Sequence, residues 1–422
     1  MTYDIPQLIA GAEKELRPVF DSFDEISNAR TEEILDAFRE FRVDDTMFGS
    51  TSGYGYDDKG RDTLDRIFAR VLGAESGFVR HSIANGTHAL TIALWALLRP
   101  GDVMLAITGR PYDTLMGVIG LSDRPAPSKD GAHPATPDGS LLDFGVFYDD
   151  VPFGEDWRPK VRRYQEEGRL KVVYIQRSRG YADRPTLSAD EINAMISEIR
   201  TMTGAYVIVD NCYGEFADLD EPKGDLVVGS LIKNPGGGIA EAGAYIVGTP
   251  RAVELAGYRM TTVGAGVEVG ASLGNNKNMY KGLFFAPHIV AQAKKTAALA
   301  AYVFEALGCD VSPGWRDGRH DIIQTLRLGS PERLCAFCRG IQYASPVDSY
   351  VTPEPWDMPG YDDKVIMAAG AFTQGSSIEL SADGPMREPY IAFMQGGLTY
   401  ESGRYAVRMA AEEFIRSEKN EG

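Results

Sequence analysis

A single lysine stands between an apolar run and a row of glycines. Lys233 follows the apolar stretch 227–232 and precedes three glycines, and the apolar run 205–209 ends in Asp210. A lysine at one strand end can form a Schiff base with an aldehyde, and an aspartate at another can pair with a pyridinium nitrogen. This pair suits pyridoxal 5'-phosphate (PLP). Most lysines are solvated surface groups, and many aspartates at strand ends cap loops. The assignment therefore depends on finding the other parts of a cofactor site in the expected order along the chain.

A phosphate site is predicted where a glycine turn leads into an apolar helix. Asn85, Gly86 and Thr87 occupy this turn. The first turn of a helix exposes free N–H groups and the positive end of its dipole, and Thr87 adds a hydroxyl donor. An ordinary helix N-cap is the alternative. The sequence contains no P-loop consensus, so a nucleoside triphosphate is not indicated.

Further strand ends carry groups that could hold a ring or a carboxylate. Tyr112 follows an apolar strand and could stack on a flat cofactor or pack at a turn. Arg177 and Arg179 follow another strand and could bind a substrate carboxylate through two hydrogen bonds, or remain solvated. Arg387, after a strand in the C-terminal part, could serve as a carboxylate clamp from a second domain.

Alternating strands and helices must position these residues. Between about 49 and 283, β-rich runs alternate with helical segments, which is typical of a mostly parallel sheet with helices on both faces. Residues 1–48 predict a helical arm, and residues 284–422 predict a smaller α+β domain. The expected strands are 103–107, 172–175, 207–209, 226–228, 245–247, 322–328, 349–352, 378–380 and 391–393, and the expected helices include 87–98, 189–201 and 287–307.

The composition restricts the class of partner. The chain has 422 residues, of which 44% are hydrophobic, and a formal net charge of −17. Such a chain repels nucleic acid and anionic membranes, so neither is an expected partner. The N-terminus lacks the basic and apolar regions of a signal peptide, and the longest apolar run is too short to span a bilayer. We therefore expect a soluble cytoplasmic protein.

Four cysteines are too few for a disulfide scaffold in a chain of this length. Cys335 and Cys338 match the C-x-x-C spacing, but no second pair or nearby histidine completes a zinc site. Two apolar positions of one helix are the favoured interpretation, and no metal is expected.

From about residue 30 to 405 the chain resembles the methionine γ-lyase-like "aluminium resistance" family, which belongs to the fold-type I PLP enzymes of cysteine and methionine metabolism. The segments around Asp210 and Lys233 are the most specific part of this resemblance. The matching stretches are 53–58, 86–89, 108–115, 176–181, 209–216, 229–238, 345–360 and 395–401.

The resemblance implies the fold-type I PLP-dependent transferase fold and a homodimer or homotetramer with active sites shared between subunits. It implies that Lys233 holds PLP while Tyr56, with Arg61, reaches the phosphate of a neighbouring subunit. Tyr54 and the three arginines are the expected substrate-binding residues. The expected cofactor-binding residues are Asn85, Gly86, Thr87, Tyr112, Gln176, Asp210, Ser230, Lys233 and Tyr56, of which Tyr112, Asp210 and Lys233 are also expected to take part in catalysis.

Three departures from the family pattern bear on substrate choice. Asn85 stands where serine is usual, Ser82 where glutamine is expected, and 241–244 reads Glu-Ala-Gly-Ala in place of Pro-Thr-Gly-Gly. Glu241 could assist acid–base chemistry, repel an anionic side chain, or be a solvated loop carboxylate.

The resemblance and the residues together predict a PLP-dependent lyase acting on a small L-amino acid. Lys233 would be the base at Cα, and a γ- or β-substituent would leave. Expected substrates are methionine- or cystathionine-like sulfur compounds, or a γ-halo unsaturated amino acid in a specialised biosynthetic role. The alternatives are a PLP-dependent aminotransferase and a non-catalytic PLP-fold protein linked to metal resistance.

Overall fold

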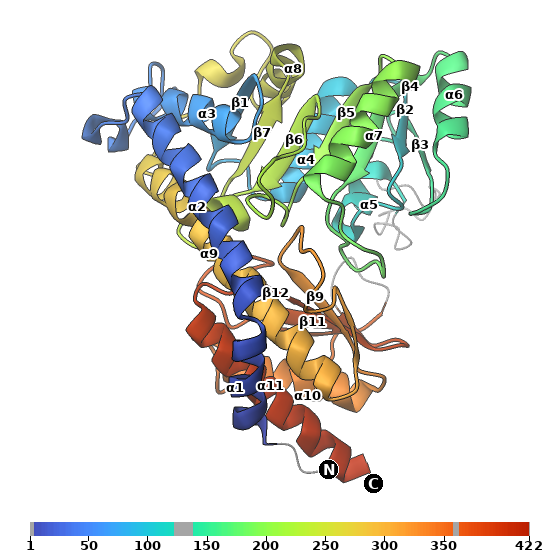
Figure 1. The fold of residues 1–422 in the computed structure, drawn as a ribbon. Coiled ribbons are helices and arrows are strands. Elements are labelled where there is room, and N and C mark those ends of the chain that lie inside the picture. Colours follow the sequence, from blue (N-terminus) through green and yellow to red (C-terminus); the bar gives the residue numbers. More distant parts are fainter. Residues whose placement is uncertain (1–3, 122–137, 358–362, 422) are drawn as a thin grey trace.

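Two β-sheets lie at opposite ends of an elongated molecule, and one long helix runs between them (Figure 1). The computed structural model describes residues 4–121, 138–357 and 363–421. The last part of the stretch 345–360, which carries some of the family resemblance, lies outside these residues.

The large sheet has seven strands and is mostly parallel. From β6 to β3 all neighbouring strands are parallel, and β7 runs antiparallel to both β6 and β1. The predicted large sheet is therefore confirmed, with an unpredicted edge strand at each side. In spatial order the strands are β1 (Ser76–Arg80), β7 (Ala244–Gly248), β6 (Leu226–Ser230), β5 (Tyr206–Asp210), β4 (Leu170–Gln176), β2 (Val103–Ala106) and β3 (Phe147–Asp150).

Helices cover both faces of this sheet because successive strand residues point to opposite faces. Alternate residues of β5, Val207 and Val209 on one side and Ile208 on the other, belong to two separate apolar clusters. One cluster packs against α3 (Lys59–Val71), α6 (Arg158–Glu166) and α7 (Ala189–Met202), and the other against α4 (Gly86–Leu97), α5 (Asp113–Ile119) and α8 (Pro250–Met260).

The small sheet is antiparallel and five-stranded. Its strands, in spatial order, are β10 (Val365–Ala368), β11 (Ser381–Pro385), β12 (Ile391–Gln395), β9 (Ile323–Arg327) and β8 (Asp310–Ser312). The expected strand at 349–352 is wrong, and the one at 378–380 is displaced, since β11 begins only at Ser381. Single short apolar runs cannot locate strands that depend on partners far away in sequence. Helices α10 (Pro331–Tyr343) and α11 (Tyr400–Glu421) pack beside this sheet, and Cys335 and Cys338 are buried in α10 as predicted.

The N-terminal arm joins the two ends of the molecule. It consists of α1 (Ile5–Glu15) and α2 (Arg17–Glu40), and Figure 1 shows α2 lying along α9 (Asn276–Ala306). Ile5 and Phe20 join the core of the small sheet, whereas Ile34 joins that of the large sheet. The predicted boundary at 283/284 lies inside α9, and this helix begins eleven residues before the expected start at 287. Short 3₁₀ helices occur at Asp45–Phe48, Asn234–Gly236 and Gly266–Glu268.

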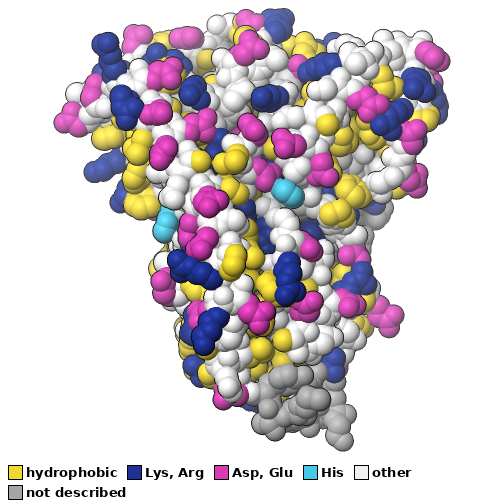
Figure 2. All heavy atoms as spheres, in the orientation of Figure 1, with side chains coloured by type: hydrophobic (Ala, Val, Ile, Leu, Met, Phe, Trp, Pro, Cys, Tyr) yellow, Lys and Arg dark blue, Asp and Glu magenta, His cyan; other side chains and the backbone are white. Residues whose placement is uncertain are grey.

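Acidic and basic side chains are interspersed over the face seen in Figure 2. None of the described helices has the length and apolar character needed to cross a membrane.

Close approach of α10 and α11 gives a stability test. A Cβ atom at Gly340 of α10 would lie 2.4 Å from the Cα of Ala410 in α11. Gly340→Ala should therefore destabilise the fold by about 1–3 kcal/mol, because backbone cannot move aside cheaply. The matched change Gly11→Ala places its Cβ in open space in α1 and should stabilise by about 0.5–1 kcal/mol through helix propensity. Denaturant unfolding of both variants measures the difference, and equal stabilities would contradict this packing.

Candidate active site

Polar residues end three neighbouring parallel strands of the large sheet. Gln176, Asp210 and Ser230 are the last residues of β4, β5 and β6, and Gln176 is paired with Asp210 in the ladder. Lys233 follows three residues after Ser230. Ligands of open α/β sheets bind at this carboxyl edge because the loops there surround a crevice.

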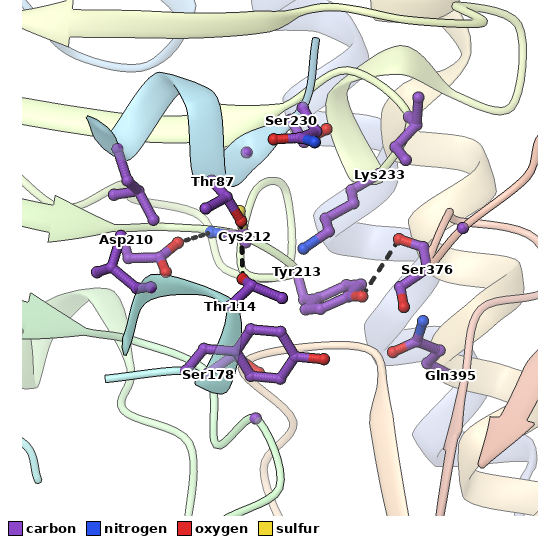
Figure 3. Close-up of a pocket in the computed structure, with 18 of the residues that line it drawn as sticks. Thr87, Thr114, Ser178, Asp210, Cys212, Tyr213, Ser230, Lys233, Ser376 and Gln395 are labelled. Atoms are coloured by element: carbon purple, nitrogen blue, oxygen red, sulfur yellow. Dashed lines mark hydrogen bonds between the residues drawn. The ribbon is translucent and has the colours of Figure 1, made fainter. Parts of the chain in front are cut away.

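A cavity of about 390 Å³ opens at this edge and reaches the small sheet. It brings together eight predicted cofactor residues from distant parts of the chain, whereas Tyr54, Tyr56 and the three predicted arginines do not line it. The eight residues are Asn85, Gly86, Thr87, Tyr112, Gln176, Asp210, Ser230 and Lys233. Figure 3 shows several of them converging on a common space.

The amine of Lys233 points into the cavity over the ring of Tyr213 (Figure 3). Its Nζ lies 4.0 Å from the ring centre. Burial opposes the charge on Lys233, but the ionisable groups around the amine outweigh burial and raise its pKa above the usual value. In falling order of effect these groups are Cys212, Tyr213, Asp210 and Glu215. Tyr213 is itself fixed, since its hydroxyl donates to Ser376 O at 3.2 Å.

The carboxylate of Asp210 is buried and held at both oxygens. Oδ2 accepts a hydrogen bond from the Tyr174 hydroxyl at 3.2 Å, and Oδ1 accepts one from the Cys212 backbone N–H at 3.1 Å. A carboxylate fixed in this way can form a charge-assisted hydrogen bond with a protonated ring nitrogen. Asp210 therefore fits the role predicted for it beside PLP.

The first turn of α4 forms a cradle that fits a phosphate. The Asn85 side chain caps the helix by accepting from His88 N at 2.8 Å. A Cβ atom at Gly86 would lie 3.2 Å from Cys212 Sγ, so a larger residue would crowd the cradle. The Thr87 hydroxyl is 2.7 Å from that of Thr114, and Ser230 is buried beside them. Free N–H groups, hydroxyls and the helix dipole meet here.

Tyr112 is held at the cavity by its backbone. Its N–H donates to Gln176 Oε1 at 2.7 Å, and Gln176 Nε2 donates to Ser178 O at 2.9 Å. A Cβ atom at Gly180 would lie 2.9 Å from the Tyr112 ring, so only glycine lets the ring take this place. Gln176 thus positions the loop that carries Tyr112.

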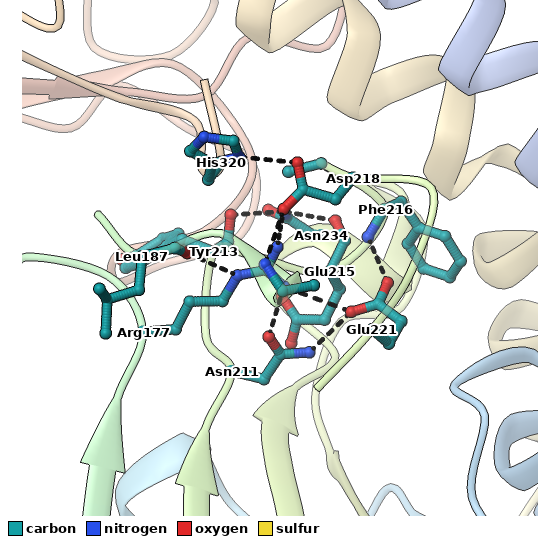
Figure 4. A network of polar contacts seen from close by, with 12 residues as sticks. Arg177, Leu187, Asn211, Tyr213, Glu215, Phe216, Asp218, Glu221, Asn234 and His320 are labelled. Atoms are coloured by element: carbon teal, nitrogen blue, oxygen red, sulfur yellow. Dashed lines mark hydrogen bonds and ion pairs between the residues drawn. The ribbon is translucent and has the colours of Figure 1, made fainter. Parts of the chain in front are cut away.

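A buried polar network surrounds Arg177 in the loops that follow β4 and β5 (Figure 4). Arg177 is 0% exposed, and its guanidinium contacts Asn211 Oδ1 at 2.7 Å, Asp218 Oδ2 at 2.7 Å and Glu221 Oε2 at 3.3 Å. The expectation that Arg177 binds a substrate carboxylate is therefore wrong. Its charge is already paired inside the protein, and it stabilises the loop after β5.

The same network reaches the loop of Lys233 through two residues. Asn234 Nδ2 donates to Tyr213 O and to Glu215 O, each at 2.9 Å. Burial raises the pKa of Glu215 to about 8, although its carboxylate accepts a hydrogen bond from Tyr245 at 2.9 Å. The segments after β5 and β6 are thus tied to each other next to the cavity.

The other two predicted substrate arginines also lie away from the cavity in this chain. Arg179 is buried and donates to Ser312 O at 3.2 Å and Thr325 Oγ1 at 3.1 Å, so it joins β8 and β9 to the large domain. Arg387 is exposed and pairs with Asp363 at 2.9 Å. The structure corrects both expectations, because these side chains have other partners.

Tyr54 and Tyr56 project from the surface. They are 74% and 62% exposed, and their rings stack with centres 5.7 Å apart. Arg61 is buried beneath them and donates to Gly55 O at 2.7 Å and Gly270 O at 2.9 Å. Arg61 therefore holds the tyrosine turn in place, which corrects the expectation that it reaches a phosphate.

Sequence reasoning missed the side of the cavity built by the small domain. Ser376, Asp383, Phe393 and Gln395 line it together with Tyr181. Gln395 belongs to a stretch that matches the family, whereas Asp383 carries no such signal. Glu241 is exposed at the cavity, where its three predicted roles stay open.

Comparison with known proteins gives the family. The profile of the methionine gamma-lyase family matches residues 5–415. A solved structure from Clostridium acetobutylicum, described as a candidate cystathionine beta-lyase involved in aluminum resistance, is 43% identical, with a TM-score of 0.91 over 97% of this chain and 95% of that one. A carbon-sulfur lyase involved in aluminum resistance from Clostridium novyi NT is 42% identical, with a TM-score of 0.89 over 97% and 96%.

A more distant structure shows the fold alone. The pyridoxal-5'-phosphate dependent protein YhfS from Escherichia coli is 14% identical, with a TM-score of 0.60 over 94% of this chain and 97% of that one. The strand order and the second antiparallel sheet agree with the fold-type I architecture expected from the sequence. On the family profile and the two close structures, the chain belongs to the methionine gamma-lyase family, whose members are PLP-dependent lyases.

Proposed function

We propose that the protein eliminates a γ-substituent from an L-amino acid, with β-elimination as the nearest alternative. The observation that carries this proposal is the meeting of Lys233, Asp210 and the first turn of α4 in one cavity. The name of the Clostridium novyi relative supports a carbon–sulfur bond as the one that breaks. A methionine- or cystathionine-like compound is the first substrate class, and a γ-halo unsaturated amino acid is the second.

PLP, when bound, supplies an electron sink that stabilises negative charge at Cα of the substrate. The residues of this chain supply the rest. Asp210 would hold a proton on the ring nitrogen, and the α4 turn with Ser230 would hold the phosphate. In its neutral form, Lys233 would take the proton from Cα, since its amine is the one basic side chain among the described residues that line the cavity. Tyr112, which lines the cavity, would stack on the ring.

The reaction type can be tested with purified holoenzyme and single substrates. L-methionine, L-cystathionine, L-homocysteine and a γ-halo amino acid should be screened for release of keto acid and ammonia. In D₂O, γ-elimination should place deuterium at Cβ of the recovered substrate, because a proton must leave Cβ as well as Cα. Exchange confined to Cα, or turnover that needs an added keto acid, would instead indicate β-elimination or transamination.

The proposed role of Asp210 has a direct test. Asp210→Asn should retain the cofactor but slow turnover roughly a thousandfold, because an amide cannot keep the ring nitrogen protonated. The exposed residue Asp190 offers a matched control, and Asp190→Asn should turn over like the parent. Absorbance of the bound cofactor and steady-state rates are the measurements. Near-normal turnover of Asp210→Asn would remove this residue from the mechanism.

The proposal includes a homodimer or homotetramer whose active sites are shared. Two exposed, stacked tyrosines on a turn anchored by a buried arginine support it, because large exposed aromatic groups are typical of interfaces. The chain's own cavity contains neither tyrosine, so Tyr56 and Tyr54 would serve the cavity of a neighbouring subunit.

Mixing inactive chains tests this sharing. A Lys233→Ala chain mixed with a Tyr56→Ala chain should recover about a quarter of the parent activity, since half of randomly paired dimers are hybrids with one intact site of two. A mixture of Lys233→Ala with Asp210→Asn is the control and should stay inactive, because both changes lie in the same cavity. No recovery in proven hybrids, or a monomer in sedimentation, would contradict the shared site.

A further inference from the structure

The face of the small sheet that turns toward the cavity carries unpartnered polar atoms. Ser381, Asp383 and Gln395 are 5%, 6% and 8% exposed. Ser381 Oγ, Asp383 Oδ1 and Gln395 Nε2 have no hydrogen-bond partner among the described residues. Buried polar atoms without partners are uncommon in folded proteins because their desolvation is unfavourable. Two of these atoms, Asp383 Oδ1 and Gln395 Nε2, belong to residues that line the cavity, and they indicate a ligand that supplies the missing hydrogen bonds.

The ladder places these side chains together. Ser381 lies opposite Gln395 in the β11–β12 pair, and Asp383 lies two residues farther along the same face. The residues between them, Ala382 and Met394, point the other way into the core of the small sheet. Asp383 and Gln395 line the same cavity as Lys233, on its opposite, small-domain side.

The charge of the cavity adds a second constraint. Among its described lining residues, Lys233 is the only lysine or arginine, whereas Asp210, Glu241 and Asp383 are acidic. Lys233 and Asp210 are directed at the cofactor in the proposed function. Glu241 and Asp383 therefore remain as the charges facing the substrate, and both attract a cation.

We propose that Asp383, with Gln395 beside it, forms a subsite that binds the far end of the substrate side chain and selects an ammonium-bearing end over an apolar one. This inference rests on the proposed function, since it places the substrate in the same cavity. The favoured substrate class is a thioether amino acid whose far end carries its own ammonium and carboxylate groups. The ammonium would contact Asp383 and the carboxylate would accept from Gln395 Nε2. A substrate ending in a methylthio group would leave Asp383 Oδ1 and Gln395 Nε2 without hydrogen bonds.

Burial raises the pKa of Asp383 to about 7, so the test is made at pH 8, where its carboxylate is ionised. L-ornithine and L-norleucine are suitable probes because their side chains have the same number of heavy atoms and differ only in a terminal ammonium or methyl group. Their dissociation constants for the holoenzyme are measured by calorimetry. Ornithine should bind about tenfold tighter than norleucine, as expected for a cation near buried carboxylates.

Asp383→Asn should remove this preference by weakening ornithine about tenfold while leaving norleucine within about twofold. Retained norleucine binding shows that the variant is folded. The matched control is Asp310→Asn, an exposed position of the same sheet in β8, which should keep the preference. Equal affinities in the parent protein overturn the proposal without any variant, and an unchanged preference in Asp383→Asn overturns the role of this residue.

Neither probe carries a leaving group, so the outcome is separate from that of the elimination assay. If ornithine binds more tightly but no substrate is eliminated, the proposed subsite stands and the proposed lyase function is rejected. Elimination without ornithine preference would retain the lyase function and reject the subsite.

Discussion

The carboxylate of Glu221 connects the parts of the structure on which the candidate site depends. One of its oxygens pairs with Arg30 of the N-terminal arm at 3.0 Å, and the other pairs with Arg177 after β4 at 3.3 Å. Arg177 also binds Asp218, which contacts His320 at the edge of the small domain at 2.8 Å. Buried charges are tolerated only when each has partners with good geometry. Removing any one of these side chains would therefore leave a buried charge without its partner. This requirement holds the arm, the strand-end loops and the small domain in one arrangement.

The two sides of the cavity have different physical characters. The large sheet contributes a helix terminus, hydroxyls, a fixed carboxylate and a lysine, all at the carboxyl edge of parallel strands. Such groups suit an anionic, planar cofactor, and they are held in place by hydrogen bonds within the protein. The small sheet contributes buried polar atoms that have no partner within the described protein. Polar atoms that lack a partner in the protein can bind a ligand that is exchanged at each turnover. The difference between the two sides of the cavity therefore agrees with a cofactor held by the large sheet and a substrate held by the small one.

The predictions that succeeded concern residues whose position follows from local pattern. Asp210 and Ser230 end apolar, β-rich runs, and parallel strands must bring such ends to one edge. Asn85 and Gly86 lie at a turn before an apolar helix, where a cap is expected. The C-x-x-C spacing of Cys335 and Cys338 was correctly interpreted as two apolar helix positions, because the surrounding sequence has helical periodicity.

The predictions that failed concern partners that lie far away in the sequence. The sequence does not distinguish between three arginines, Arg177, Arg179 and Arg387. Each follows a predicted strand and could bind an anion. They differ in the partners that bind them. Arg177 pairs with Asp218 and Glu221, and Arg179 donates to Ser312 and Thr325. Arg387 pairs with Asp363. The sequence alone determined the sheet of the large domain, the strand-end and helix-cap residues that line one side of the cavity, and the family. Only the tertiary structure decided which charges are already paired, and that Asp383 and Gln395 face Lys233 across the cavity. The physical reason is that charge pairing and antiparallel register depend on long-range contacts, whereas strand ends and helix caps depend on neighbours in the chain.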